Sequence, residues 1–125
     1  MSQVTSLVLT YHARDRRVVE DLVLTATTED QRFVDCTEAA NEGARGPCRK
    51  MLQLQLAATA VNGFDVQDLV QRIESAPWRS PEAVMLLVLG EQEMRPAVWG
   101  FAGASSFECV DVPRRFVELL ERVTS

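Results

Sequence analysis

The single histidine of the chain, His12, is the first residue whose type fits catalysis. It follows a β-rich segment and precedes Asp15 by three positions. Strand ends are common places for sites in α/β sheets. A histidine that titrates near neutral pH could therefore act as a general base with Asp15 or with Cys36. The competing interpretation is a partly exposed histidine that makes a local hydrogen bond.

Three cysteines, Cys36, Cys48 and Cys109, together with His12 have the ligand count of a Cys₃His zinc centre. The spacing argues against such a centre, because structural zinc sites usually contain a close Cys-x₂₋₄-Cys pair, whereas eleven residues separate Cys36 from Cys48. Cys109 stands in an alternating strand pattern, where cysteine commonly packs as a small hydrophobic residue. We therefore expect no metal and no other cofactor. A redox link between Cys36 and Cys48 stays open, although neither has a Cys-x-x-Cys context.

No sequence motif of a known catalytic chemistry occurs in the chain. There is no Gly-x-Ser-x-Gly elbow, and "GFAGASS" (100–106) lacks the lysine and the spacing of a phosphate-binding loop. One histidine cannot form a His-Glu-x-x-His zinc motif. The residues thus favour a non-catalytic protein, and a small enzyme that uses His12 is the third-ranked interpretation.

Acidic residues are concentrated between positions 29 and 42. Five acids occur within these fourteen residues, against Arg32 alone. They are Glu29, Asp30, Asp35, Glu38 and Glu42. Acidic patches speed docking onto basic surfaces, as when small inhibitor or immunity proteins capture basic nuclease toxins. An ordinary solvated turn region is the competing interpretation.

Trp78 is a further candidate for partner binding. It stands between two prolines in "APWRSP". An exposed tryptophan on such a stiff loop would suit the centre of an interface. The alternative is a side chain that folds back over the edge of the core.

The composition of the whole chain limits the classes of function. A length of 125 residues fits one domain, 1–125, with one core. The first apolar run has no basic region before it and is too short for a signal peptide or a membrane span, and an odd number of cysteines fits the reducing cytoplasm. Thirteen basic against eighteen acidic residues give a net charge of −5, which opposes attraction to nucleic acid or to anionic lipid. We expect a basic protein as partner, no nucleic acid and no membrane, and leave a homo-oligomer open.

Hydrophobic periodicity predicts the order of the elements. Within 50–60, Leu52, Leu54 and Leu56 alternate with glutamines, which indicates a strand buried on its leucine face. The segment 14–26 has a helical stripe, although a hairpin with a strand at 17–25 competes, and 80–83 has a helix-start signature before a strand. The predicted strands are 4–12, 32–36, 50–60, 83–89, 97–102 and 107–112, and the predicted helices are 14–26, one capped by Asp65 that ends near Ala76, and one that begins at Pro113.

This order predicts an α+β fold: a ferredoxin-like βαββαβ sandwich with a C-terminal ββα extension. It resembles the order of elements in the nitrogen-regulatory PII and CutA-type trimers, which carry a long functional loop between their second and third strands. The loop expected here is 37–49. The resemblance rests on element order alone and implies an alternative function, an oligomeric ligand-sensing regulator whose loop closes over a small anion. Its candidate ligand-binding residues are His12, Arg45, Arg49 and Lys50.

Overall fold

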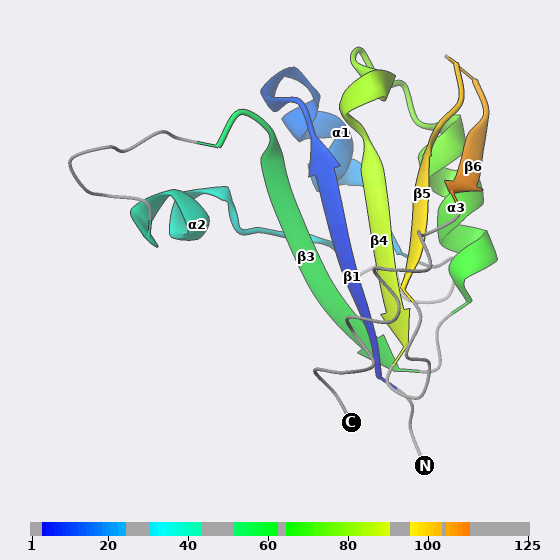
Figure 1. The fold of residues 1–125 in the computed structure, drawn as a ribbon, viewed down its shortest axis with the longest axis horizontal. Coiled ribbons are helices and arrows are strands. Elements are labelled where there is room, and N and C mark those ends of the chain that lie inside the picture. Colours follow the sequence, from blue (N-terminus) through cyan, green and yellow to red (C-terminus); the bar gives the residue numbers. More distant parts are fainter. Residues whose placement is uncertain are drawn as a thin grey trace.

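The computed structural model of the chain describes residues 4–24, 31–43, 52–62, 65–90, 96–103 and 105–110. These residues form a mixed α+β fold with one six-stranded antiparallel sheet (Figure 1). In sheet order the strands are β2 (Val34–Asp35), β3 (Gln55–Asn62), β1 (Val4–Tyr11), β4 (Met85–Gly90), β5 (Ala97–Phe101) and β6 (Phe107–Val110). The helices are α1 (Arg16–Asp21), α2 (Thr37–Gly43) and α3 (Val66–Ser75), and two short 3-10 helices are η1 (Ala13–Asp15) and η2 (Pro81–Ala83).

The strand order differs from that of the four-stranded ferredoxin-like sandwich expected from the sequence, because two more strands belong to the same sheet. β5 pairs with β4, and β6 pairs with β5, so that both continue the sheet beyond β4. Strands that follow one another along the chain usually pair as neighbours, which accounts for this extension. The helix predicted from Pro113 lies outside the described residues.

Several predicted elements are present with shorter bounds. The helix predicted for 14–26 is confirmed only for Arg16–Asp21, because the chain is extended at Leu22 and Val23 forms an isolated bridge with Arg32. The competing hairpin with a strand at 17–25 is wrong. The helical turn expected at 80–83 is η2. Asp65 caps α3 as predicted, since its Oδ1 accepts a hydrogen bond from the Gln67 N–H at 3.0 Å.

The predicted orientation of the third strand is wrong. Leu52 and Leu54 precede β3 and are 40% and 37% exposed. The buried residues of β3 are instead Ala57 and Val61. The pairing of β3 with β1 determines which β3 side chains face the core. Ala57 lies opposite the fully buried Leu9, so the Ala57 side chain points to the same face of the sheet as the Leu9 side chain.

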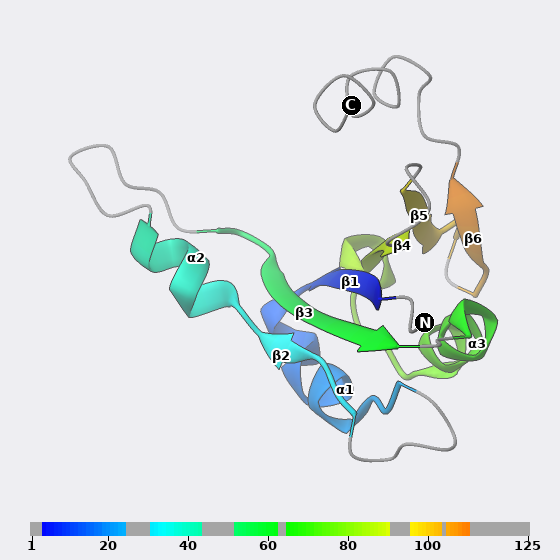
Figure 2. The ribbon, with the colours of Figure 1, turned by 90° about the horizontal axis from the view of Figure 1, so that it is seen from below.

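One face of the sheet carries the core. Figure 2 shows α1 and α3 on the same side of the strands. Between these helices and the sheet lie buried aliphatic and aromatic side chains: Leu7, Leu9 and Tyr11 of β1, Ala57 and Val61 of β3, Leu86 and Val88 of β4, Phe107 of β6, Val19 of α1, and Leu69, Val70 and Ile73 of α3. No helix of the described residues lies against the opposite face. None of the described helices is long and apolar enough to cross a membrane.

Candidate functional site

Residues 34–43, here called the β2–α2 edge, contain three of the five acids singled out from the sequence. The sequence predicts a loop from residue 37, but Thr37–Gly43 form a helix, so that prediction is wrong for this segment. In both ribbon views α2 extends outward past the edge strand β2, away from the helices that cover the core (Figures 1 and 2). The β2–α2 edge therefore presents a helix, and not a loop, to solvent.

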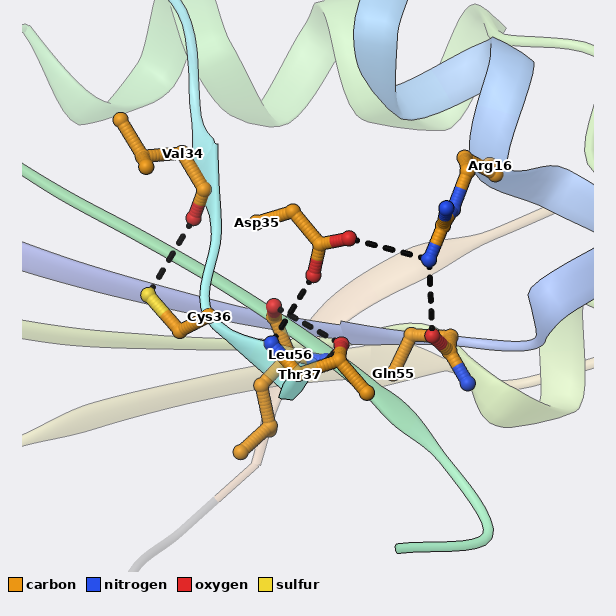
Figure 3. Close-up of polar contacts among 7 residues, drawn as sticks. All are labelled: Arg16, Val34, Asp35, Cys36, Thr37, Gln55 and Leu56. Atoms are coloured by element: carbon orange, nitrogen blue, oxygen red, sulfur yellow. Dashed lines mark hydrogen bonds and ion pairs between the residues drawn. The ribbon is translucent and has the colours of Figure 1, made fainter. Parts of the chain in front are cut away.

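Thr37 attaches α2 to the sheet (Figure 3). Its side chain is 3% exposed, and its hydroxyl accepts from the Leu56 N–H at 2.8 Å and lies 3.3 Å from the Leu56 carbonyl oxygen, to which it donates. The Cys36 N–H donates to the same carbonyl at 2.8 Å. Thr37 thus satisfies a backbone N–H of β3 at the point where β2 has ended. The first turn of α2 is fixed to the sheet by side-chain contacts.

Asp35 connects the start of α2 with α1. Its Oδ1 accepts from the Thr37 N–H at 3.0 Å, and its Oδ2 lies 3.0 Å from Nη2 of Arg16 (Figure 3). The same guanidinium donates to Oε1 of Gln55 at 3.3 Å. Burial alone would raise the pKa of Asp35, but the Thr37 hydrogen bonds and the Arg16 charge outweigh it and lower that pKa below its ordinary value. Asp35 is therefore ionised at neutral pH.

Tyr11 lies beside this ion pair but does not offer acid–base chemistry. Its side chain is 1% exposed. Burial, followed by the charge of Asp35, raises the pKa of Tyr11 above its ordinary value of 10.0. A general acid or base works best with a pKa near the working pH. With the pKa of Asp35 lowered and that of Tyr11 raised, these two groups anchor the β2–α2 edge and are not suited to proton transfer near neutrality.

Glu38 and Glu42 occupy exposed positions on α2. They are four residues apart, so they share one face of the helix. Glu38 lies in the first turn, where a negative charge interacts favourably with the helix dipole, but Glu42 lies in the last turn, where it does not. Like charges at this spacing also oppose each other.

Of the other predicted partner-binding residues, only Trp78 lies in the part of the chain that the structure describes. Glu29 and Asp30 lie outside the described residues. Trp78 is half-buried against the core, contrary to the exposed side chain that an interface centre needs, and its Nε1–H donates to the Ile73 carbonyl at 2.6 Å. The indole folds back because a buried N–H requires an acceptor and the end of α3 offers one. The second interpretation of Trp78, a cover for the core edge, describes its position.

The side chains of His12 and Asp15 have separate hydrogen-bond partners. Nδ1 of His12 accepts hydrogen bonds from the backbone N–H of Arg14 at 3.1 Å and from Nε of Arg14 at 3.3 Å. These local contacts agree with the interpretation of His12 as a partly exposed histidine that makes a local hydrogen bond. The Asp15 carboxylate is directed instead at backbone N–H groups of Arg79 and Ser80. Arg45, Arg49 and Lys50 lie outside the described residues.

Two of the cysteines are free thiols in the described part of the chain. Cys36 is half-buried, with Sγ 3.3 Å from the Val34 carbonyl oxygen. Cys109 is exposed, so the prediction that it packs as a small hydrophobic residue is wrong. Cys48 lies outside the described ranges. Among the residues that the structure describes, no three His, Cys, Asp or Glu side chains are grouped so that they could hold a metal ion.

The chain matches no protein-family model, no curated protein and no solved structure.

Thr37 provides a test of how α2 is held. Thr37→Val removes the hydroxyl and leaves the Leu56 N–H without its acceptor, so we expect a loss of about 2 kcal/mol in the free energy of unfolding. Thr37→Ser keeps the hydroxyl and should lose clearly less. Urea denaturation followed by circular dichroism measures both. No loss in Thr37→Val together with a loss in Thr37→Ser would show that the methyl group, and not the hydrogen bonds, matters at this position.

Proposed function

We propose that the protein is a non-catalytic, acidic protein-binding module of the inhibitor or immunity type, which binds a basic protein such as a toxin through the β2–α2 edge. The observation that carries this proposal is the pair Glu38 and Glu42, exposed one turn apart on a helix whose first turn is fixed to the sheet. A rigid support lowers the entropy that a surface loses on binding. The acids are thus presented in a preorganised form.

The negative charge of the chain indicates that the proposed partner is positively charged. The chain carries a net charge of −5, and Asp35 adds an ionised carboxylate at the base of α2. Complementary charge mainly raises the association rate, by factors of roughly 10 to 10³ at low ionic strength. The free thiols of Cys36 and Cys109 support the cytoplasm as the compartment in which binding takes place.

The test compares two variants of equal net charge. Glu38→Lys with Glu42→Lys changes the net charge from −5 to −1, because each substitution adds two positive charges. The control is Asp21→Lys with Glu82→Lys, two exposed acids outside the β2–α2 edge, which gives the same net charge. Partners captured on the immobilised wild-type protein are identified by mass spectrometry, and the purified partner is then used in stopped-flow binding.

We expect the edge variant to associate about tenfold more slowly at low salt and to lose most of the salt dependence. The control should keep a rate close to that of the wild type, because its charges lie away from the contact. Unchanged kinetics in the edge variant would contradict the proposal. Equal slowing in both variants would assign the effect to net charge and would equally remove the edge as the binding surface.

For residues 4–90 we infer the ferredoxin-like βαββαβ plan that the sequence predicts. In its support, α1 lies between β1 and β2 along the chain and α3 lies between β3 and β4, and both helices pack on one face. The first two elements of the expected ββα extension correspond to β5 and β6. The ligand-sensing alternative depends on Arg45, Arg49 and Lys50, which lie outside the described residues, and it stays a prediction.

A further inference from the structure

The face of the sheet opposite α1 and α3 is apolar across its full width. Six residues that pair directly from strand to strand form one row over all six strands, here called the aliphatic row. In sheet order they are Val34, Ala58, Val8, Leu87, Val98 and Val110. Paired residues point to the same face. A sheet face that meets water normally carries polar residues instead.

Most of the exposed large hydrophobic residues in the described part of the chain lie on this face. Of the eight large hydrophobic residues that are exposed in the described part of the chain, six belong to strands and lie on this face, and the other two, Leu52 and Leu54, precede β3. The six are Val4, Val34, Met85, Leu87, Leu89 and Val110. Val34 and Val110, at the two ends of the aliphatic row, are 64% and 54% exposed. Contiguous apolar surface of this kind marks an interaction site.

Charge is scarce in the same region. The row next to the aliphatic row contains Thr10, Met85, Gly100 and Glu108, which pair in that order. Glu108 lies at the outer strand β6, where its carboxylate accepts a hydrogen bond from the Ser106 hydroxyl at 3.0 Å. The centre of the face is therefore free of charged side chains among the described residues, as in the core of a subunit interface.

We infer that a second copy of the chain covers this face, so that two sheets pack face to face in a homodimer. The width of the apolar surface supports a sheet as the occupant. Six strands at a spacing of about 4.8 Å span roughly 24 Å, whereas a helix with its side chains is only about 10–12 Å across. A single helix from the fifteen residues that follow Val110 would cover about half of the aliphatic row.

Area and symmetry support the same occupant. Strands of about 20 Å over that width give a flat projection of roughly 500 Å², and the accessible surface of side chains exceeds the projection, approaching the roughly 600–1,000 Å² per partner of stable interfaces. A twofold axis requires a self-complementary surface. The aliphatic row begins and ends with valine and has Val8 and Leu87 at its centre. A second copy rotated about the twofold axis would therefore place aliphatic side chains against aliphatic side chains along the whole row. Stacked sheets about 10 Å apart would bury these residues.

The dimer goes beyond the proposed function and is tested with a different surface. Leu87→Glu introduces a charge at the centre of the aliphatic row. Leu54→Glu is the matched control, because Leu54 is also 37% exposed but precedes β3, outside the paired strands. Sedimentation velocity at about 1 to 200 µM should give the wild type and Leu54→Glu about twice the chain mass of 14.0 kDa. Leu87→Glu should weaken dimerisation at least about 100-fold, because a charge would be buried without a partner.

Circular dichroism must show that Leu87→Glu is folded. If it is not, Val110→Glu replaces it, because the 54% exposed Val110 tolerates a polar side chain in the monomer more easily. A wild type that is monomeric throughout would overturn the inference and would point to residues 111–125 as the cover of this face. A dimer that persists in Leu87→Glu and Val110→Glu would overturn it as well. Neither result bears on Glu38 and Glu42.

Discussion

Replacing Asp15 with alanine is expected to lower the free energy of unfolding by about 3–5 kcal/mol. The Asp15 side chain is fully buried and accepts two backbone hydrogen bonds, from the Arg79 N–H at 2.8 Å and the Ser80 N–H at 2.9 Å. Alanine would leave both donors without an acceptor, and Ser80 itself is only 3% exposed. Buried donors that lose their partner cost the full desolvation penalty.

The position of Asp15 explains why so much depends on one carboxylate. It connects η1, at the end of β1, with the segment that leads through η2 into β4, 64 and 65 residues further along the chain. Asp15→Asn keeps one acceptor oxygen and should lose roughly half as much. Asp21→Ala, at an exposed acid of α1, should lose less than about 0.5 kcal/mol. Urea denaturation compares the three variants, and a loss below 1 kcal/mol in Asp15→Ala would contradict the role assigned to these hydrogen bonds.

Elements with a continuous apolar run or a helical apolar stripe are those that the sequence predicts well. β1 and β4 follow from apolar runs, and α3 follows from apolar residues at helical spacing, since burial of apolar side chains drives their formation. α2 does not, because its residues after Thr37 include no large apolar side chain that could reveal a helical stripe. Its helix depends on good helix formers such as Ala39 and Ala40 and on the Asp35 hydrogen bond at its start. Propensity and capping, and not periodicity, were the signals in this segment.

The acidic site was predictable in part. Local acid density pointed to Asp35, Glu38 and Glu42, and the structure brings these three to the β2–α2 edge. Thr37 and Asp15 were missed as anchoring residues, because their partners lie 19 and 64–65 positions away and nothing in their own neighbourhood specifies them. Long-range backbone hydrogen bonds of this kind leave no spacing pattern.

The uncovered face also bears on how apolar runs are interpreted. The segments that became β1 and β4 are apolar at consecutive positions, which predicts strands buried on both faces. The described residues bury only one face, so Met85, Leu87 and Leu89 stay exposed at 37–45%. The homodimer inferred above would bury both faces of these strands, as their apolar runs predict, because the second sheet would cover the face that α1 and α3 leave open.

Trp78→Ala is expected to lower the free energy of unfolding by about 2–3 kcal/mol, less than for a fully buried tryptophan because the side chain is half-buried. Part of the loss is packing against the core, and part is the indole hydrogen bond to the Ile73 carbonyl. That carbonyl belongs to the last turn of α3, where carbonyl groups lack a partner within the helix. It also accepts from the Ala76 N–H at 3.2 Å, so it keeps one partner when the indole is removed.

A pair of phenylalanine variants separates the two contributions. Trp78→Phe keeps most of the packing but removes the indole hydrogen bond, so its free energy of unfolding should fall by about 1 kcal/mol. Trp99→Phe is the matched control, because the Trp99 Nε1–H is buried and has no hydrogen-bond partner among the described residues. Removing an unsatisfied donor relieves its desolvation penalty, so Trp99→Phe should lose less than Trp78→Phe in guanidinium denaturation. No loss in Trp78→Phe would mean that Trp78 contributes by packing alone and that the end of α3 does not depend on its indole.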